Sequence, residues 1–209
     1  MQIRADPRAV SSHMIVVIDY RAGNLYNVGN ALRHLGCDWI QSKDPGVVGR
    51  ASKVILPGVG SAAAAMESLQ EEGLVEVLRA TKAPFLGICL GLQLLFERSE
   101  EENTECLGIL AGSVRRFDST RMKVPHIGWN QVRGTGDALM AGIPDGSSFY
   151  FVHSYCAQAS APTTIARTEY GVEFASVVRH QNFRGVQFHP ERSGEVGLRL
   201  LENFVSDKG

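Results

Sequence analysis

A single cysteine stands where an extended strand pattern changes abruptly into a helical one. In the run Pro84-Phe-Leu-Gly-Ile-Cys-Leu-Gly-Leu-Gln93, the strand pattern is interrupted by G-x-C-x-G around Cys89, and apolar residues then recur at helical spacing at Leu92, Leu95 and Phe96. This is the pattern of a nucleophile elbow, with Cys in place of Ser. The positive end of the following helix suits a nucleophilic thiol. We therefore predict a cysteine nucleophile that breaks an acyl bond.

A histidine and a glutamate near the C-terminus could supply the base that such a nucleophile needs. His189-Pro190-Glu191 follows the apolar run 185–188. In an extended chain, residues two apart project to the same side, so the imidazole and the carboxylate can form a hydrogen bond. His189 would take the thiol proton and later protonate the leaving amine, while Glu191 fixes the tautomer. Alone, H-P-E is equally compatible with a surface turn, but its occurrence with the elbow favours catalysis.

Two further patterns could complete such a site. The segment Pro57-Gly-Val-Gly60 follows the strand pattern 54–56, and its glycines would let a main-chain N–H point at a developing oxyanion. Leu90 would supply the second N–H of the elbow. Gln93 lies four residues beyond Cys89, on the same helix face, and could bind the polar end of a substrate. An ordinary turn and a solvated helix residue remain the alternatives for these two patterns.

Alternating strand and helix patterns predict an α/β fold that positions these residues. Residues 14–19 form a strand pattern, and Leu25, Val28, Leu32 and Leu35 then mark a helix that ends at Gly36. Such alternation implies a mostly parallel sheet with helices on both faces and ligands at the carboxyl ends of its strands. In the first half we also expect strands at 37–40 and 53–56 and a helix through Leu74, Val77 and Leu78.

From about Gly112 the pattern shifts towards strands, so we predict a β-rich second half in the same single domain. The expected strands are 113–117, 148–153, 163–167, 173–179 and 185–188. The segment 123–130, which contains Trp129, is interpreted as an aromatic among turn residues. A final helix begins at Ser193 as its N-cap. Residues 1–13 lack the apolar core of a secretory signal and are predicted to be a disordered or non-native leader, with 14–209 forming the domain.

The composition narrows the class of protein. The 209 residues carry a net charge of -1 and are 44% hydrophobic, which gives no basic surface for nucleic acid and no apolar run near the ~20 residues that span a bilayer. No C-x-x-C pair occurs, so neither a zinc site nor a disulfide framework is indicated, and a reducing cytoplasm is the predicted location. His153-Ser-Tyr-Cys156 has a spacing that a metal could use, but it lacks a second ligand pair. We predict no metal and no cofactor.

Taken together, the motifs Gly87-Ile-Cys-Leu-Gly-Leu-Gln93 and His189-Pro-Glu191 resemble those of the triad-type (class I) glutamine amidotransferases. Within that superfamily, further segments are similar to the glutaminase subunits of imidazole glycerol phosphate synthases from histidine biosynthesis: Ile18-Asp-Tyr20 with Gly23-Asn24, Pro57-Gly-Val-Gly60, Val124-Pro-His-Ile-Gly-Trp-Asn130 and Phe151-Val-His-Ser-Tyr155. The similarity runs from Met14 nearly to the C-terminus. The Cys and H-P-E motifs specify only the superfamily, whereas P-G-V-G combined with P-H-I-G-W-N is much more specific.

The resemblance implies a class I glutamine amidotransferase fold and a role for each matching residue. It implies Cys89 as nucleophile, His189 as base and Glu191 as orienting carboxylate. The other implied residues are Gly58, Val59, Gly60 and Leu90 for the oxyanion hole, Gln93, Ser154 and Tyr155 for glutamine binding, and His126, Trp129 and Asn130 for the partner interface. The implied reaction is hydrolysis of glutamine to glutamate and ammonia through a glutamyl thioester.

The resemblance also implies a second subunit. Ammonia would pass to a cyclase with a (β/α)8 barrel in a heterodimer, which forms imidazole glycerol phosphate and an aminoimidazole carboxamide ribotide. An oxyanion segment that is misaligned until this partner binds would prevent wasteful hydrolysis, so we expect weak glutaminase activity in the isolated chain. Departures from the family pattern are Arg21, Ser61, Cys156 and Arg192. None removes a triad group, although Arg21 and Arg192 could alter the glutamine mouth or the partner contact.

Three alternatives remain open at this point. The chain could be an amidotransferase subunit of another pathway, such as anthranilate or pyridoxal phosphate synthesis, although P-H-I-G-W-N argues against this. A stand-alone cysteine hydrolase of related fold would need its own substrate pocket and no partner. A catalytically idle regulatory subunit is disfavoured by the intact Cys89, His189 and Glu191.

Overall fold

The computed structural model describes residues 14–20, 25–134, 136–158 and 163–207. The leader 1–13 and Arg21 lie outside these residues. The helices are α1 (Leu25–His34), α2 (Pro45–Val48), α3 (Ala62–Glu71), α4 (Val75–Ala80), α5 (Leu90–Gln93) and α6 (Gly194–Ser206), with 3-10 helices η1 (Glu101–Asn103), η2 (Ala138–Met140) and η3 (Pro190–Arg192). The strands are β1 (Ile15–Ile18), β2 (Trp39–Ser42), β3 (Lys53–Gly58), β4 (Phe85–Cys89), β5 (Phe96–Ser99), β6 (Thr104–Glu105), β7 (Leu110–Arg116), β8 (His126–Val132), β9 (Ser147–His153), β10 (Tyr155–Ala157), β11 (Thr164–Tyr170), β12 (Val172–His180) and β13 (Phe183–Val186).

A seven-stranded sheet forms the centre of the molecule, in the order β11-β12-β13-β4-β3-β1-β2. The five strands from β13 to β2 are parallel, and β12 and β11 extend the sheet as antiparallel strands. The apolar residues of β1 are buried throughout, as expected for a strand that is covered on both faces. The predicted mostly parallel sheet is therefore confirmed.

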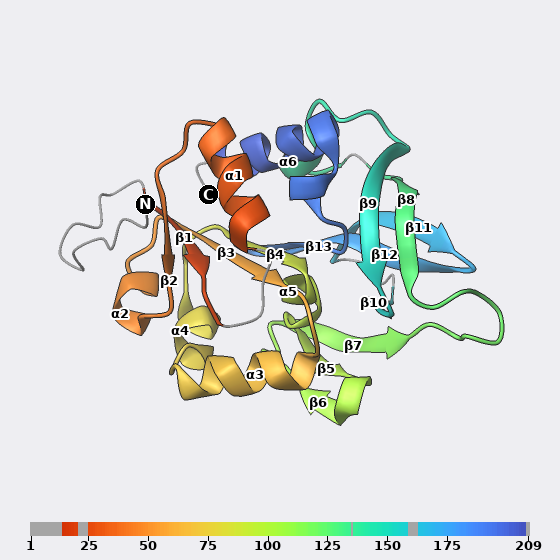
Figure 1. Cartoon of the computed structure of the whole chain (residues 1–209), viewed down its shortest axis with the longest axis horizontal. Coiled ribbons are helices and arrows are strands. Elements are labelled where there is room, and N and C mark those ends of the chain that lie inside the picture. Colours follow the sequence, from red (N-terminus) through yellow and green to blue (C-terminus); the bar gives the residue numbers. More distant parts are fainter. Residues whose placement is uncertain (1–13, 21–24, 135, 159–162, 208–209) are drawn as a thin grey trace.

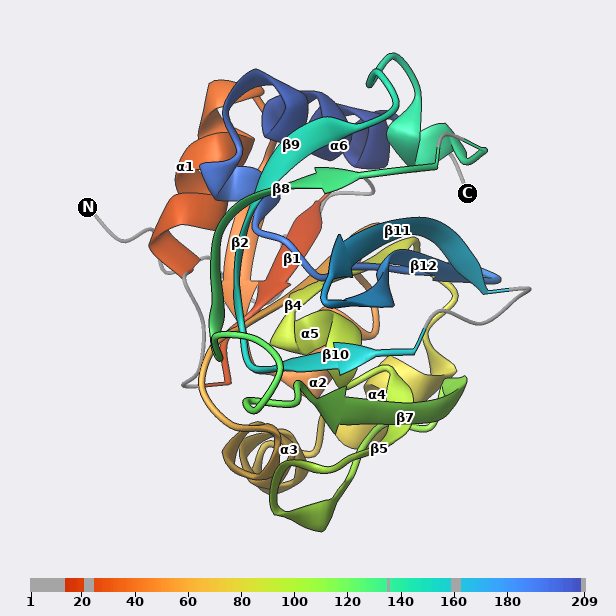
Figure 2. The ribbon, with the colours of Figure 1, turned by 90° about the vertical axis from the view of Figure 1, so that its right-hand side faces the viewer.

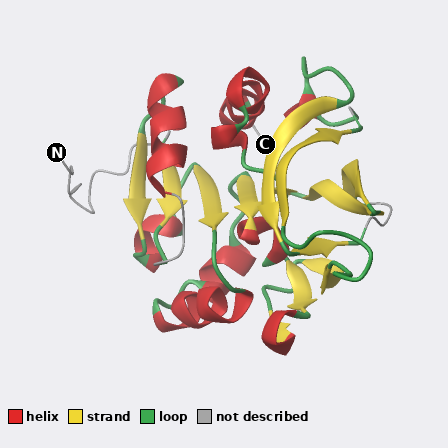
Figure 3. Ribbon diagram, turned by 45° about the vertical axis from the view of Figure 1, so that its right-hand side comes forward, coloured by secondary structure: helices red, strands yellow, loops and turns green. Residues whose placement is uncertain are grey.

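Helices cover both faces of this sheet, as Figures 1 and 3 show. Helices α1 and α6 lie on one face, above the sheet in Figure 1, and α2, α3 and α4 lie on the other. Each face has its own apolar core: Leu32 and Phe204 belong to the cluster under α1 and α6, and Leu69 and Leu78 belong to the cluster under α3 and α4. The two cores fix the central strands, whose carboxyl ends carry the predicted chemistry.

Two smaller groups of strands lie beside the central sheet. A four-stranded sheet has the order β10-β7-β5-β6, and β8 and β9 form a separate antiparallel pair that we call the β8–β9 ribbon. In Figure 2 the two strands of the ribbon curve together past the end of the central sheet. The β-rich second half predicted from the sequence is confirmed, and three of its strands, β11 to β13, belong to the central sheet.

The structure differs from several local predictions. The helix after the elbow ends at Gln93, and Phe96 begins β5 instead of continuing the helix, because Phe96 pairs with Leu110 in the small sheet. A short run of apolar residues cannot distinguish these two outcomes. The turn prediction for 123–130 is wrong for 126–130, since β8 pairs with β9 along its whole length, whereas 123–125 lie outside any helix or strand. Helices α2 and α3 were missed, and β2 and β13 are displaced by about two residues from the predicted 37–40 and 185–188.

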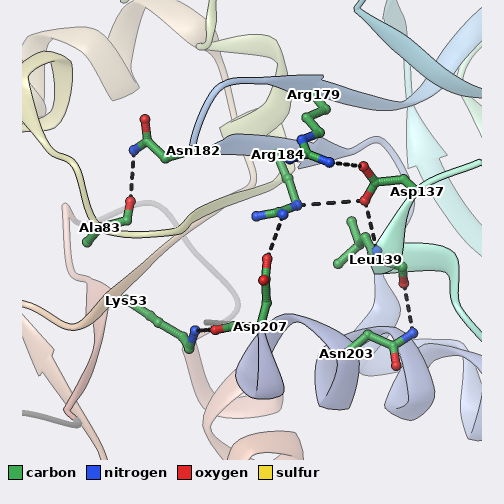
Figure 4. Close-up of polar contacts among 9 residues, drawn as sticks. All are labelled: Lys53, Ala83, Asp137, Leu139, Arg179, Asn182, Arg184, Asn203 and Asp207. Atoms are coloured by element: carbon green, nitrogen blue, oxygen red, sulfur yellow. Dashed lines mark hydrogen bonds and ion pairs between the residues drawn. The ribbon is translucent and has the colours of Figure 1, made fainter. Parts of the chain in front are cut away.

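A buried ion cluster joins α6 to the amino ends of β3 and β13 and to the carboxyl end of the antiparallel strand β12 (Figure 4). Arg184 of β13 contacts Asp207 at 2.5 Å and Asp137 at 3.7 Å, while Arg179 of β12 pairs with Asp137 at 2.8 Å. Lys53, at the start of β3, donates to the main-chain oxygen of Asp207. The cluster therefore lies at the edge of the sheet opposite to the carboxyl end of β4, where Cys89 stands.

We expect Asp137→Ala to lower the free energy of unfolding by about 3 kcal/mol, because it leaves buried Arg184 with one partner fewer. It also removes the acceptor for the main-chain N–H of Leu139 at the start of η2. Urea unfolding measures the effect. The matched control is Glu202→Ala, which breaks an exposed pair with Arg199 and should cost less than about 0.5 kcal/mol. Equal losses for the two variants would contradict a structural role for the cluster.

Candidate active site

The backbone at Cys89 is strained in the way that a nucleophile elbow requires. Cys89 has φ 54° and ψ -106°, a region that residues with a side chain rarely adopt. The two glycines of G-x-C-x-G permit close contact between strand and helix: a Cβ at Gly91 would lie 1.9 Å from the carbonyl oxygen of Leu56, and one at Gly87 would lie 2.5 Å from that of Gly91. The elbow geometry predicted from the sequence is present.

The glycine segment after β3 lies directly beside the nucleophile. Gly58 pairs with Cys89 in the register of β3 and β4. A Cβ at Gly58 would lie 2.4 Å from the hydroxyl of Tyr20 and 2.7 Å from the Cβ of Leu90, so only glycine fits. Gly60 has φ 97°, and Val59 between them is 41% exposed. Segment 58–60 is thus close to Cys89 and open to solvent at its far end.

Tyr20 anchors the near end of this segment. Its side chain is buried, and its hydroxyl donates a hydrogen bond of 2.7 Å to the carbonyl oxygen of Pro57. Burial, with a smaller contribution from Cys89, raises the pKa of Tyr20 far above its usual range. The neutral hydroxyl is therefore a permanent donor to Pro57, and it fixes the peptide that leads into Gly58.

His189 and Glu191 form the predicted hydrogen bond, with 2.9 Å between Nδ1 of the ring and Oε1 of the carboxylate. Both side chains are almost completely buried. The route differs from the prediction: Pro190 begins the 3-10 helix η3, so a tight turn rather than an extended chain brings the two groups together. The pairing itself matches the arrangement in which a carboxylate orients a catalytic imidazole.

Ser193 holds the backbone of His189 in place. Its hydroxyl donates to the carbonyl oxygen of His189 at 2.7 Å and accepts from the N–H of Tyr150 at 3.0 Å. The N–H of His189 in turn donates to the carbonyl oxygen of Tyr150. Ser193 occupies the predicted N-cap position of α6, but its hydroxyl makes no capping bond there. The capping function predicted for Ser193 is therefore wrong, and the hydroxyl supports the site instead.

The electrostatic environment keeps a proton on His189. Burial alone lowers the pKa of the ring, but the negative charge of the Cys89 sulfur and the contacts with Glu191 outweigh it and raise the pKa to about 10. Within the described part of the chain, the Nε2 atom of His189 and the Oε2 atom of Glu191 are buried without a hydrogen-bond partner. An imidazolium beside a sulfur nucleophile can protonate a leaving group directly.

Two groups contact the sulfur of Cys89. The Sγ atom lies 3.7 Å from the carbonyl oxygen of Val152 and 3.7 Å from the side-chain Nε2 of Gln187. Burial raises the pKa of the Cys106 thiol to about 11 and that of Cys156 to about 12. Those two thiols stay protonated at neutral pH, which leaves them poor nucleophiles.

The residues predicted to bind substrate lie near this centre, but Gln93 is not at a solvated mouth. It is 4% exposed, and its Nε2 donates to the carbonyl oxygen of Tyr155 at 2.8 Å and to Oε1 of Gln187 at 3.1 Å. Ser154 and Tyr155 are half-buried where β9 gives way to β10. The structure thus brings Gln93 and Tyr155 into direct contact, and their roles toward glutamine remain predictions.

The three residues predicted to contact a partner divide into buried and exposed groups. Trp129 is 59% exposed on β8, and Asn130 is half-buried beside it. His126 is only 3% exposed, with its ring packed between Tyr170 and Phe151, so the prediction that it lies on an interface surface is wrong. Alternation along a strand explains the division, since His126 and Trp129 face opposite sides of β8.

The sequence analysis missed four residues that support the site: Tyr20, Gln187, Ser193 in its supporting role, and His153. Only Gln187 carries a local signal, since it lies two residues before His189. Each of the other three has a partner that is distant in sequence, namely Pro57 for Tyr20, Tyr150 for Ser193 and His126 for His153. Both ring nitrogens of His153 are occupied by hydrogen bonds, which supports the structural interpretation of the His153 to Cys156 segment.

The described ranges contain no group of three or more His, Cys, Asp or Glu side chains arranged to hold a metal ion. Among the helices in these same ranges, none is long and apolar enough to cross a membrane.

Comparison with known proteins agrees with the geometry of the site. The family model described as "Glutamine amidotransferase class-I" matches residues 16–208. A Herpetosiphon aurantiacus protein named "Imidazole glycerol phosphate synthase subunit HisH" is 49% identical over 197 residues, which covers 92% of this chain and 93% of that protein. A Yersinia pseudotuberculosis protein of the same name is 46% identical over 193 residues, covering 91% and 98%.

Solved structures of lower sequence identity share the fold. A crystal structure of a glutamine amidotransferase superposes with a TM-score of 0.69 at 20% identity, over 90% of this chain and 98% of that one. The structure of PurLQS from Thermotoga maritima gives a TM-score of 0.68 at 18% identity, over 93% and 98%. These similarities support the predicted fold class.

Proposed function

This chain belongs to the class-I glutamine amidotransferase family, and on that premise we propose that it is the glutaminase subunit of an imidazole glycerol phosphate synthase. Relatives that bear this subunit name are 46–49% identical over more than nine-tenths of the chain. The observation that carries the proposal is the strained elbow at Cys89, which lies beside Gly58 and the buried His189–Glu191 pair. These groups supply the nucleophile, base and orienting carboxylate of glutamine hydrolysis.

The first half-reaction forms a thioester. The Cys89 sulfur attacks the carboxamide carbon of glutamine, and the negative charge that develops on the oxygen is stabilised by main-chain N–H groups of Leu90 and of segment 58–60. The imidazolium of His189 then gives its proton to the amide nitrogen. Ammonia leaves as the carbon–nitrogen bond breaks, and a glutamyl thioester remains on Cys89.

The second half-reaction regenerates the enzyme. The now neutral His189 takes a proton from water, whose oxygen attacks the thioester carbon. The carbon–sulfur bond breaks, glutamate leaves, and the sulfur anion and the imidazolium are restored. Glu191 keeps the ring in one orientation through both transfers because its Oε1 accepts from Nδ1, which leaves Nε2 directed at the reacting atoms.

The partner in this proposal is a cyclase subunit with a (β/α)8 barrel, which receives the ammonia and forms a heterodimer with this chain in the cytoplasm. Support comes from the outer strand of the β8–β9 ribbon, where Ile127 is 58% and Trp129 is 59% exposed. Large apolar side chains exposed beside each other are typical of a surface that another chain covers. Asn130 lies next to them on the same strand.

We expect the purified chain alone to release glutamate slowly from glutamine, and the cyclase with its nucleotide ligand to raise this rate by about 10- to 100-fold, a usual range for coupling between sites. The physical reason is a rearrangement of segment 58–60, which is solvent-exposed at Val59 and Gly60. A coupled assay for glutamate measures the effect. Equal turnover with and without the partner would contradict the switch, and full activity of the monomer on γ-glutamyl peptides would favour a stand-alone hydrolase.

A further inference from the structure

The β8–β9 ribbon contacts both halves of the catalytic pair. On its inner strand β9, the carbonyl oxygen of Val152 lies 3.7 Å from the sulfur of Cys89. On the same strand, the carbonyl oxygen of Tyr150 accepts from the N–H of His189 at 2.9 Å. The outer strand β8 carries exposed Trp129 and Ile127. One two-stranded element therefore connects an exposed apolar surface to the nucleophile and to the base.

A continuous chain of hydrogen bonds follows the same path through the interior. It begins at Asn130 on β8 and ends at the sulfur of Cys89. The successive contacts are Asn130 Nδ2 to His126 Nε2 (3.3 Å), His126 Nδ1 to His153 Nε2 (2.9 Å), His153 Nδ1 to Tyr155 O (2.8 Å), Gln93 Nε2 to Tyr155 O (2.8 Å), Gln93 Nε2 to Gln187 Oε1 (3.1 Å) and Gln187 Nε2 to Cys89 Sγ (3.7 Å).

The direction of the bonds on the histidine side is fixed by chemistry. A carbonyl oxygen only accepts, so Nδ1 of His153 carries the proton that it shares with Tyr155. The Nε2 atom of a neutral His153 is then a bare acceptor, and Nδ1 of His126 must donate to it. This leaves Nε2 of His126 to accept from Asn130, whose Oδ1 is already taken by the N–H of Gln131. Both imidazoles must be neutral for this pattern to hold.

The environment of the two rings satisfies that condition. Burial lowers the pKa of His126 to about 4. Burial also lowers the pKa of His153 to about 3, against the opposing effect of its hydrogen bond to Tyr155. Neither ring is protonated near neutral pH. No other titratable side chain forms part of the hydrogen-bond chain between Asn130 and Gln187. The hydrogen-bond pattern therefore stays the same at pH values near neutrality.

On the glutamine side, the amide of Gln93 fixes the amide of Gln187. Because the Nε2 of Gln93 donates to Oε1 of Gln187, the other end of that amide, Nε2, must point at the Cys89 sulfur. Gln187 is completely buried and has no freedom to turn away. The two donor series meet at the carbonyl oxygen of Tyr155, which has no proton to pass on. The chain therefore cannot conduct a proton, and what it can do is hold geometry.

We propose that Gln187 is a positioning residue for the nucleophile, and that the hydrogen-bond chain from Asn130 makes the position of the Cys89 sulfur depend on the β8–β9 ribbon. We take the protein that covers the exposed strand β8 to be the cyclase, and this assignment rests on the proposed function. A chain that only satisfied buried polar groups would affect folding stability alone. A positioning chain also changes the reactivity of the sulfur.

The first test is the rate at which iodoacetamide alkylates Cys89 in the isolated chain at pH 7, followed by mass spectrometry of the Cys89 peptide. We expect Gln187→Met, which keeps the shape but removes the donor, to slow alkylation about tenfold, a loss typical of a hydrogen bond to a charged group. The matched control is Ser176→Ala, which removes a completely buried hydroxyl that has no partner among the described residues. Its rate should stay within about twofold of the parent chain.

The second test asks whether the chain acts as one unit. We expect His126→Phe, which preserves ring stacking, to slow alkylation about threefold, and the double variant with Gln187→Met to react no more slowly than Gln187→Met alone. If the rate reductions of the two single variants instead multiplied in the double variant, the two residues would act independently and the proposed coupling would be wrong. In the parent chain, nitrogen-15 NMR of the imidazoles should find both rings neutral with the proton on Nδ1. A proton on Nε2 of either ring would contradict the proposed hydrogen-bond chain. This measurement uses the parent protein, so it does not depend on whether a variant folds.

Steady-state hydrolysis of glutamine completes the experiment. A positioning role predicts that Gln187→Met lowers kcat about tenfold and leaves KM within about twofold, because the interaction is with the nucleophile and not with bound substrate. Loss of stability with an unchanged kcat would refute it. Alkylation and NMR need neither glutamine nor partner. A chain without glutaminase activity would therefore refute the proposed function and still leave the positioning role open to these measurements.

Discussion

Replacing Cys89 with alanine is expected to lower glutamine hydrolysis by about 10⁵-fold or more, the usual loss when a covalent nucleophile is removed. The variant should still support synthesis by the complex when ammonia is supplied directly, because the cyclase reaction needs only the released nitrogen. Substitution for the missing sulfur by another thiol is not expected, since Cys106 and Cys156 are buried with raised pKa values. Parallel assays with glutamine and with an ammonium salt measure both activities.

The control for this experiment is Cys106→Ala, which removes a buried thiol from the core cluster under α3 and α4 and should leave both activities within about twofold. Loss of the glutamine-dependent and the ammonia-dependent activity together in Cys89→Ala would mean that Cys89 is structural. Retention of glutamine hydrolysis would mean that the nucleophile lies elsewhere. Failure of the unmodified chain to react with an electrophilic glutamine analogue would revive the idle regulatory subunit.

The elbow could be predicted from sequence because its constraints are local and steric. Strand and helix approach so closely that a Cβ at Gly91 would overlap the carbonyl oxygen of Leu56, and only glycine permits this. The same holds for Gly58, beneath the hydroxyl of Tyr20. The hydrogen bond between His189 and Glu191 could likewise be predicted, because the two residues are only two positions apart in sequence. In each case, residue type and spacing within a few positions contain most of the information.

The rest of the site could not be predicted, because its contacts join residues far apart in the chain. Gln187 meets Gln93 across 94 positions, and Tyr155 meets Gln93 across 62. His126 and His153 face each other only because β8 pairs with β9 in one register. Pro125 and Gly128 made that strand look like a turn. Strand pairing overrode local propensity there, as it did when Phe96 began β5 and not a further turn of helix.

Besides long-range contacts, the burial of individual side chains could not be predicted from the sequence pattern. Helical spacing correctly placed Gln93 on the face of Cys89, but β10 and Gln187 cover that face and bury the amide. His126 was assigned to an interface with its neighbours Trp129 and Asn130, yet its side chain points inward. Periodicity tells which residues share a face, and only tertiary packing decides whether that face meets solvent.

Replacing Glu191 with glutamine is the second change with a large expected effect, a fall of about 10²- to 10⁴-fold in kcat/KM at pH 7, as for other orienting carboxylates. Glutamine keeps the shape but loses the charge, and its amide nitrogen can force the ring into the opposite tautomer. Nε2 would then carry the only proton of a neutral ring and could not accept one. The matched control is Glu195→Gln, an exposed residue of α6 that should leave the rate unchanged.

Glu191→Gln should also change the pH dependence of kcat/KM in a defined direction. The charge of Cys89 and the contacts with Glu191 together raise the pKa of His189 to about 10, so the imidazolium persists through neutral pH and is lost above that value. Removing the carboxylate charge takes away part of what stabilises the cation. The basic limb of the kcat/KM profile should therefore move from near pH 10 towards neutrality. A smaller rate with an unmoved basic limb would mean that Glu191 acts on the fold and not on the charge of His189.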